Sequence, residues 1–281
     1  MIRGKALFAA AALGVSVGAF GALAKTVDPV AYCHSRLSVM GRKFFHQWSG
    51  EISLCQQRRM NGDVDLASKC YPDEMVRADT STFCQAPDDV LVDPNYQRRL
   101  CRAEQHSHEK IARKCEDDYL TQFELGVPCG TVATVARLQD CIDFDAHGQN
   151  AVDFTRTVYG SVGRVMDDTL RGCMITIFET GQVYARKVMK IIGDKCELFV
   201  SEGKLSGPCP DQGSQKQLKK ARRIFAESVL AACIDDLAAH RVPFGPPCDN
   251  LPGATPSDYI DCVASAAEAD AMRGVSTVWL P

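Results

Sequence analysis

Apolar residues recur at spacings of three and four along two long stretches of the chain, residues 33–55 and 173–196. This period places the apolar side chains on one face of a helix, so both stretches are predicted to be amphipathic helices. The same pattern returns over residues 96–115 and 215–233, after a polar stretch that contains glycine. The chain is therefore predicted to form two antiparallel helix hairpins, one in each half.

Shorter helices are predicted downstream of each hairpin, over residues 140–157 and 261–272, and the second of these is rich in alanine. The alternation of apolar and polar residues that marks β-strands is nearly absent. The predicted fold is mainly α, with two tandem disulfide-stapled helix-hairpin units over residues 25–165 and 166–281. The first unit carries an insert near residues 71–94.

The first 24 residues have the pattern of a secretory signal peptide. Arg3 and Lys5 precede an apolar run that is rich in alanine and glycine, and an A-x-A cleavage pattern ends at Ala24. An uncleaved membrane anchor is the alternative, but alanine and glycine partition only weakly into hydrocarbon. We therefore expect export to the periplasm, the cell surface or the medium, with a mature N-terminus at Lys25 and no transmembrane span after cleavage.

The amino-acid composition is that of a globular protein, with 46% hydrophobic and 24% charged residues in a chain of 281. A formal net charge of −3 gives no overall attraction to nucleic acid, so no nucleic-acid partner is expected. Cysteine is the exception: there are 14, with no C-x-x-C pair of the kind that binds zinc or haem. In an oxidising compartment so many cysteines indicate disulfides, and no cofactor or metal is expected.

Twelve of the cysteines fall into two ordered sets of six, one in each half of the chain. Successive separations are 22, 15, 45, 14 and 12 residues in the first set and 23, 13, 24, 15 and 14 in the second. Only the third interval differs strongly, and the two remaining cysteines, Cys84 and Cys101, lie within it. The sequence G-V-P-C that ends at Cys129 also matches G-P-P-C that ends at Cys248. These correspondences predict an internal duplication.

The geometry of a hairpin orders the expected disulfide pairs, although sequence alone does not fix their connectivity. The second and third cysteines of each set flank the turn, the first and fourth lie at its open end, and the fifth and sixth remain. The expected pairs are Cys55–Cys70, Cys33–Cys115, Cys129–Cys141, Cys196–Cys209, Cys173–Cys233 and Cys248–Cys262, with Cys84–Cys101 tethering the insert. An exchange of Cys129 or Cys248 with an open-end partner is the alternative. No cysteine is left over for catalysis or metal binding, and stability is expected to come from disulfides rather than from one large core.

The best metal candidate is the pair His106 and His108 on a predicted helix. Residues two apart on a helix point in different directions, so a solvated helix surface is the favoured interpretation. The paired aspartates at 117–118, 167–168 and 235–236 are interpreted in the same way, as helix-surface charge. No nucleophile elbow, phosphate-binding loop or dinucleotide fingerprint occurs, so no catalytic residue is expected.

A basic stretch lies on the predicted helix over residues 215–233, and it consists of Lys216, Lys219, Lys220, Arg222 and Arg223. A stretch at the matching position in the first half is thinner, and it consists of Arg98, Arg99 and Arg102. Such a stretch suits an acidic glycan, a lipid headgroup or nucleic acid. The favoured interpretation is a solvated helix face that pairs with acidic residues elsewhere.

The second set of cysteines, with the sequences G-P-C at Cys209 and G-P-P-C at Cys248, resembles a cysteine-rich helical repeat of exported proteins from environmental bacteria. The resemblance extends over nearly all of the mature chain and rests mostly on cysteine spacing. It implies a fold and export, without an assigned activity. We therefore expect a non-enzymatic, exported structural or binding protein whose partner is an envelope or extracellular polymer or protein. The alternative is an exported metal-binding protein or enzyme that uses His106 and His108.

Overall fold

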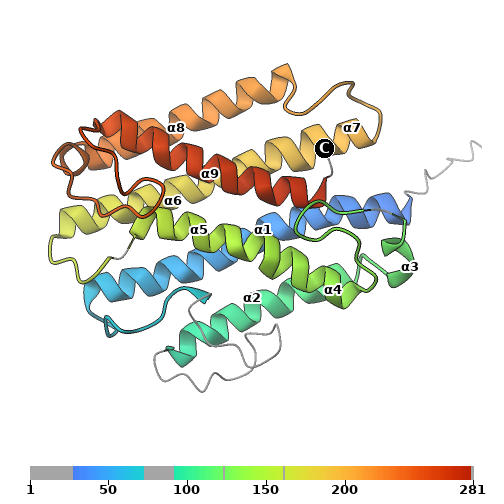
Figure 1. Cartoon of the computed structure of the whole chain (residues 1–281), viewed down its shortest axis with the longest axis horizontal. Coiled ribbons are helices and arrows are strands. Elements are labelled where there is room, and N and C mark those ends of the chain that lie inside the picture. Colours follow the sequence, from blue (N-terminus) through green and yellow to red (C-terminus); the bar gives the residue numbers. More distant parts are fainter. Residues whose placement is uncertain (1–27, 73–91, 123, 161, 280–281) are drawn as a thin grey trace, which may run out of the picture.

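A computed structural model of the protein describes residues 28–72, 92–122, 124–160 and 162–279 (Figure 1). All regular structure in these ranges is helical, and they contain no strand. The predicted mainly α fold is therefore confirmed. The predicted signal peptide and most of the predicted insert lie outside the described residues.

The helices follow the predicted stretches, with longer downstream helices than the sequence pattern indicated. Their bounds are α1 Pro29–Asn61, α2 Pro94–Ala112, α3 Asp117–Leu120, α4 Val135–Asp140, η2 Cys141–Gly148, α5 Gln149–Tyr159, α6 Asp168–Ile191, η3 Ile192–Glu197, α7 Leu198–Ser201, α8 Gln212–Ala238 and α9 Pro256–Val278. The elements η2 and η3 are π-helical and continue α4 and α6 without a break.

Each of the five long helices begins at a side chain that accepts a hydrogen bond from the backbone of its first turn. These N-cap residues are Asp28, Asp93, Asp167, Asp211 and Thr255. Proline follows the cap directly in α1, α2 and α9, where its missing N–H group leaves no helical hydrogen bond unmade. Local sequence thus determines where these helices start.

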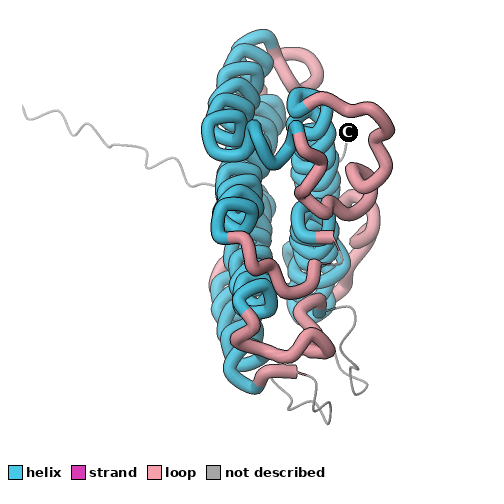
Figure 2. The backbone as a smooth tube through the Cα atoms, turned by 90° about the vertical axis from the view of Figure 1, so that its left-hand side faces the viewer, coloured by secondary structure: helices cyan, strands magenta, loops and turns pink. Residues whose placement is uncertain are grey.

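The helices form two layers (Figures 1 and 2). One layer contains α8, α6, α1 and α2 side by side, and the second contains α9 and α5, which pack against each other and across the first. Among the described residues, no helix covers the outer side of the four-helix layer. That layer therefore has one buried and one open side.

The apolar core is continuous across both halves of the chain. Its largest fully buried side chains come from both halves and include Phe44, Trp48, Tyr96, Phe154, Tyr159 and Tyr184. The packing of α1 on α6 and of α5 on α9 joins the halves. The expectation that disulfides would take the place of one large core is therefore wrong: the amphipathic faces of both hairpins are buried against one another.

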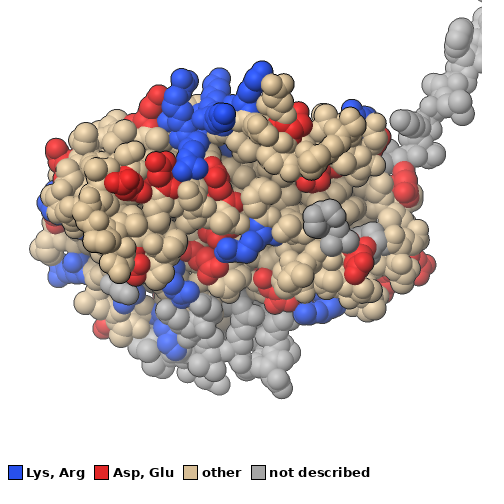
Figure 3. Space-filling view, turned by 45° about the horizontal axis from the view of Figure 1, so that its top comes forward, with Lys and Arg blue, Asp and Glu red and all other residues tan. Residues whose placement is uncertain are grey.

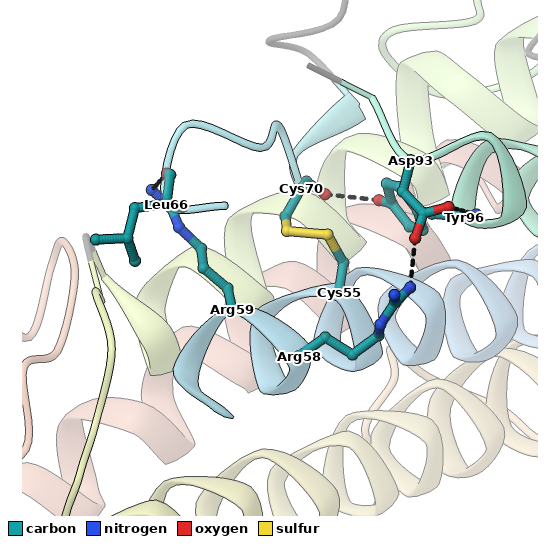
Figure 4. The surroundings of a disulfide bond; sticks show 7 residues. All are labelled: Cys55, Arg58, Arg59, Leu66, Cys70, Asp93 and Tyr96. Carbon is teal, nitrogen blue, oxygen red and sulfur yellow. Dashed lines mark hydrogen bonds and ion pairs between the residues drawn. A yellow bond between two sulfur atoms is a disulfide. The ribbon is translucent and has the colours of Figure 1, made fainter. Parts of the chain in front are cut away.

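The described residues contain six disulfides, which are six of the seven expected pairs: Cys33–Cys115, Cys55–Cys70, Cys129–Cys141, Cys173–Cys233, Cys196–Cys209 and Cys248–Cys262. Of the seventh pair, Cys84 lies outside the described residues. No cysteine in the described part of the chain is free. Around the turn bridge Cys55–Cys70, the Tyr96 hydroxyl donates a hydrogen bond of 2.6 Å to the Cys70 carbonyl, and Arg58 pairs with Asp93 (Figure 4). The bridge is thus packed between α1 and the start of α2.

The two halves hold each other through a reciprocal pair of contacts. The Gly126 N–H of the first half donates to the Thr277 carbonyl of α9 at 2.8 Å, and the Thr277 hydroxyl donates to the Val127 carbonyl at 3.0 Å. In the second half, the Gly245 N–H donates to the Thr157 carbonyl of α5 at 3.0 Å, and the Thr157 hydroxyl donates to a neighbouring loop carbonyl at 2.9 Å. Each proline-containing loop therefore fastens the last helix of the other half. We call this arrangement the reciprocal threonine clamp.

A helix that spans a membrane needs about 20 consecutive, mostly apolar residues. Within the described ranges, none of the helices is both long enough and apolar enough to cross a bilayer.

Candidate functional site

The open side of the four-helix layer carries a groove between α6 and α8. The two helices are antiparallel: Cys173–Cys233 joins them at one end, and the Lys195 ammonium donates to the Gln217 amide at 3.2 Å near the other. The groove encloses about 350 Å³. Its lining residues are Glu179, Thr180, Val183, Tyr184, Lys187, Ala221, Ile224, Phe225 and Ser228.

The middle of this α6–α8 groove is apolar. Val183 is 44% exposed and Ile224 is 40% exposed, although both are large hydrophobic residues. Beneath them the rings of Tyr184 and Phe225 are stacked, with centroids 5.6 Å apart. Rigid aromatic rings form the floor, and branched aliphatic side chains form the walls.

The two ends of the groove carry opposite charge. Because α6 and α8 are antiparallel, Glu179 and Ser228 lie at one end, and Lys187 and Ala221 lie at the other. Eight residues of α6 separate Glu179 from Lys187, which corresponds to about 12 Å along the helix. A ligand in the groove would therefore meet a negative end, an apolar middle and a positive end.

Five exposed lysines lie on α6 and α8 at the positive end of the groove and beyond it. Lys187 and Lys190 belong to α6, and Lys216, Lys219 and Lys220 belong to α8. None of the five forms a salt bridge with a residue in the described part of the chain. Basic side chains gather along the upper edge of the molecule, where α8 lies (Figure 3). We call these five residues the lysine face.

The remaining two basic residues of the α8 stretch have acidic partners. Arg222 pairs with Glu268 and Asp261 of α9 at 3.1 Å, and Arg223 lies 3.5 Å from Glu227. The expectation that the basic stretch pairs with acidic residues therefore holds for its two arginines and not for its lysines.

The floor of the groove is held from behind by the Arg222 contacts. The Tyr184 hydroxyl hydrogen-bonds to Glu268, which Arg222 also binds. Burial of the ring, together with its bond to Glu268, raises the pKa of the Tyr184 hydroxyl. Tyr184 therefore stays neutral and fixed in orientation, which makes it a structural floor and not an acid or a base.

A buried polar cluster occupies the first hairpin and the π-helical segment η2. The Ser107 hydroxyl donates to the fully buried Asp143 carboxyl at 2.8 Å, and His108 lies 3.4 Å from the other carboxyl oxygen. Burial raises the pKa of Asp143 well above its usual range, against the opposing effect of the Ser107 hydrogen bond. Burial therefore favours the protonated form of Asp143. None of the residues in this cluster lines the α6–α8 groove.

The metal candidates are not brought together. His106 is exposed, whereas His108 faces Asp143 in the interior. In the described part of the chain, no group of three or more histidine, cysteine, aspartate or glutamate side chains is arranged to hold a metal ion. The divergence of the two histidines follows from their spacing of two residues on α2.

The paired aspartates have mostly structural roles. Asp167 caps α6 and binds Arg241 at 2.6 Å, and Asp117 accepts a hydrogen bond of 2.7 Å from the Val135 backbone N–H group. The interpretation as surface charge is wrong for Asp236, which is 1% exposed and paired with Arg241. Through Arg241, the last turn of α8 is therefore joined to the start of α6.

A second cavity of about 440 Å³ lies where the loop around Tyr71 meets the loop around Phe244. Its arginines are already engaged within the chain: Arg156 lies 4.5 Å above the Tyr71 ring, and Arg59 donates to the Leu66 carbonyl at 2.5 Å (Figure 4). Lys69 also has a partner. The lysine face and the α6–α8 groove are therefore the better candidate for a binding site.

Comparison of the chain with protein-family models, curated proteins and solved structures gives no match. Sequence reasoning found the lysines of α8 but missed Lys187, Lys190 and Val183 of α6. The signal for the two lysines was present, since both lie outside the apolar stripe of α6. Val183 lines a groove only because α8 packs beside it. The position of α8 cannot be predicted from the local sequence pattern of α6.

Proposed function

We propose that the protein is an exported, non-enzymatic binding protein whose lysine face holds an anionic partner of the envelope or the extracellular space. The observation that carries the proposal is the set of five exposed lysines without a salt bridge to a described residue, gathered on two adjacent helices. Salt bridges satisfy the arginines around them. Unpaired like charges repel one another, so a face of this kind is stabilised when an anion binds.

The disulfides support the exported location. Six bridges within the described ranges persist only where the surroundings are oxidising, such as a periplasm or an extracellular medium. A helical body fastened at both ends of each hairpin also holds the lysines of α6 and α8 in fixed relative positions. Fixed positions reduce the ordering entropy that binding would otherwise require.

The site supports binding more than catalysis. The groove contains Glu179 and Lys187 at opposite ends, about 12 Å apart along α6, so no acid and base converge on one point. Asp143 and His108 line neither this groove nor the cavity beside Tyr71. We therefore assign the binding role to the surface and a structural role to the buried polar cluster.

The test is binding of the oxidised mature chain, residues 25–281, to immobilised dextran sulfate as a generic polyanion. The chain offers a matched pair of variants, because Lys216 and Lys220 stand at the same distances before Cys233 as Arg98 and Arg102 stand before Cys115. All four side chains are exposed. K216Q/K220Q should weaken binding at least fivefold, whereas R98Q/R102Q should weaken it less than twofold.

Binding should also weaken steeply as salt is raised from 50 to 500 mM, because screening shortens the range of charge attraction from about 10 Å at 0.1 M to about 3 Å at 1 M. Equal losses from the two variants would show that net charge alone drives binding and would overturn the assignment to the lysine face. Absence of binding by the wild-type chain at low salt would overturn the proposal itself.

A further inference from the structure

The α6–α8 groove has no apolar counterpart on the first hairpin. Val183 stands ten residues after Cys173, and the residue ten after Cys33 is Lys43. Ile224 stands nine residues before Cys233, and the residue nine before Cys115 is His106. The same two helical positions thus carry exposed polar residues in one hairpin and exposed apolar residues in the other.

The difference shows that the hairpin does not need apolar residues at these positions to pack. Lys43 and His106 are exposed on a hairpin that has the same bridges and the same antiparallel packing. Exposed Val183 and Ile224 leave apolar surface in water, which is unfavourable unless something covers it. The walls of the groove are therefore better explained by a ligand than by the fold.

The shape and charge of the groove restrict that ligand. About 350 Å³ lies at the low end of the range of small-molecule sites and is too small for a folded partner. The middle accepts hydrocarbon, and the end at Lys187 leads to Lys220, one residue before Ala221 of the lining. Glu179 at the opposite end repels a second negative group. A complementary molecule has one alkyl chain and one anionic head.

We propose that the α6–α8 groove binds a single-chain anionic amphiphile, with its alkyl chain on Tyr184 and Phe225 and its carboxylate or phosphate head at Lys187 and Lys220. The position of the head rests on the proposed function of the lysine face, but the apolar middle is an independent observation. Binding involves no covalent step.

The proposal predicts how affinity depends on the ligand. Burial of a methylene group contributes enough to tighten binding by up to about fourfold per carbon, until the chain fills the groove. Octanoate, decanoate and dodecanoate should therefore bind with increasing affinity. Dodecyltrimethylammonium, with the same chain and a positive head, should bind at least tenfold more weakly than dodecanoate, because Lys187 and Lys220 repel it.

The experiment is isothermal titration calorimetry of the oxidised mature chain with these probes, each kept below its micelle concentration. The main variant is V183K/I224H, which places the residues of the first hairpin in the groove. Both positions are exposed and their counterparts already hold these residues, so the variant should fold, with circular dichroism as the check. Dodecanoate affinity should fall at least tenfold, while dextran sulfate binding should stay within about twofold of wild type or rise.

The matched control is K43V/H106I, which makes the reverse change on the first hairpin and should leave dodecanoate binding within about twofold. K187Q/K220Q should weaken dodecanoate binding at least threefold and should reduce the preference over the cationic probe. A wild-type chain that binds dextran sulfate but not dodecanoate would overturn this inference and leave the proposed function standing. Binding that occurs only above the micelle concentration, or that V183K/I224H retains, would also overturn it.

Discussion

The hairpins α1–α2 and α6–α8 have the same frame and opposite distributions of polarity. Each has a bridge at its turn and a bridge at its open end. In the first, Ser107 bonds to a buried aspartate, and the surface nearby is polar. In the second, Phe225 stands at the position that corresponds to Ser107, eight residues before the fourth cysteine, and stacks on Tyr184.

The comparison shows that two hairpins with the same disulfides can differ in the polarity of their buried and exposed residues. Glu104, eleven residues before Cys115, is buried, whereas Arg222 at the matching position before Cys233 reaches across to α9. The bridges and helix caps fix the frame, so these positions vary without changing the fold. One hairpin has polar residues inside, and the other has an apolar groove and a lysine face outside.

The largest expected effect comes from the bridges that the hairpins share. Replacing both cysteines of an open-end bridge by alanine should lower the free energy of unfolding by about 4 kcal/mol, since these bridges close loops of 82 and 60 residues. The turn bridges close loops of 15 and 13 residues and should contribute about 3 kcal/mol each. Urea unfolding of C33A/C115A, C173A/C233A, C55A/C70A and C196A/C209A measures all four.

Because one core joins the halves, each variant should unfold in a single transition. The free energy of unfolding should fall by similar amounts when the same bridge is removed from either hairpin. Two separate transitions in the wild-type chain would contradict the shared core. A difference of more than about 2 kcal/mol between the two open-end variants would contradict the equivalence of the frames.

The next effect concerns pH and a matched pair on α5 and α9. Asn150 stands seven residues before Thr157, and Asp270 stands seven before Thr277. Burial raises the pKa of Asp270 from 3.8 to about 7 in the fold, with Arg273 opposing the rise. The folded state therefore holds a proton that the unfolded chain has released, so this contribution to stability is complete below pH 3.8 and is lost as pH rises through about 7.

The variant Asp270→Asn gives the second half the residue that the first half has at the matching position, Asn150. It also removes the titrating carboxyl group. Between pH 4 and pH 8 the free energy of unfolding of the wild-type chain should fall by about 2–4 kcal/mol relative to that of Asp270→Asn. Urea unfolding at each pH measures the difference. Parallel profiles for the two proteins would show that Asp270 is ionised throughout and would contradict its burial as a neutral group.

A smaller effect tests how tightly η2 is packed. A Cβ atom at Gly41 would lie 2.0 Å from Nε2 of His147, and the ring cannot retreat because Gly274 is on its other side, where a Cβ would lie 2.6 Å from Cε1. Gly41→Ala should therefore destabilise the fold by about 1–3 kcal/mol through overpacking. The control is Gly172→Ala, also within a helix but with open space around it, which should stabilise the fold by about 0.5–1 kcal/mol.

Thermal unfolding distinguishes the two glycine variants, since their shifts in Tm should have opposite signs. A stabilised Gly41→Ala would mean that His147 can move and that the contact between α1 and η2 is loose.

The smallest effect comes from the reciprocal threonine clamp. Thr157→Val and Thr277→Val each remove a hydroxyl that donates to a loop carbonyl of the other half. Each should lower the free energy of unfolding by about 1 kcal/mol, and by similar amounts, because the two contacts are equivalent. Urea unfolding checks both, and an effect confined to one threonine would show that the clamp is not reciprocal.

The sequence predicted the frame because the frame depends on local patterns. Apolar spacing and cysteine positions were enough to predict α1, α2, α6 and α8 and the six bridges now observed. The continuous core could not be predicted, since the contacts of α5 with α9 join residues more than 100 positions apart. The groove was missed for the same reason: Val183 is one more apolar residue on α6 until the packing of α8 leaves it beside Ile224.

The central claim is that a ligand binds to one hairpin and not to the other. Hydrogen–deuterium exchange of the oxidised chain of residues 25–281, with and without saturating dodecanoate, measures both hairpins in one experiment. We expect slower exchange over residues 179–187 and 221–228 and no change over the corresponding residues 39–47 and 103–110. Equal protection of both hairpins, or protection confined to the first, would contradict it.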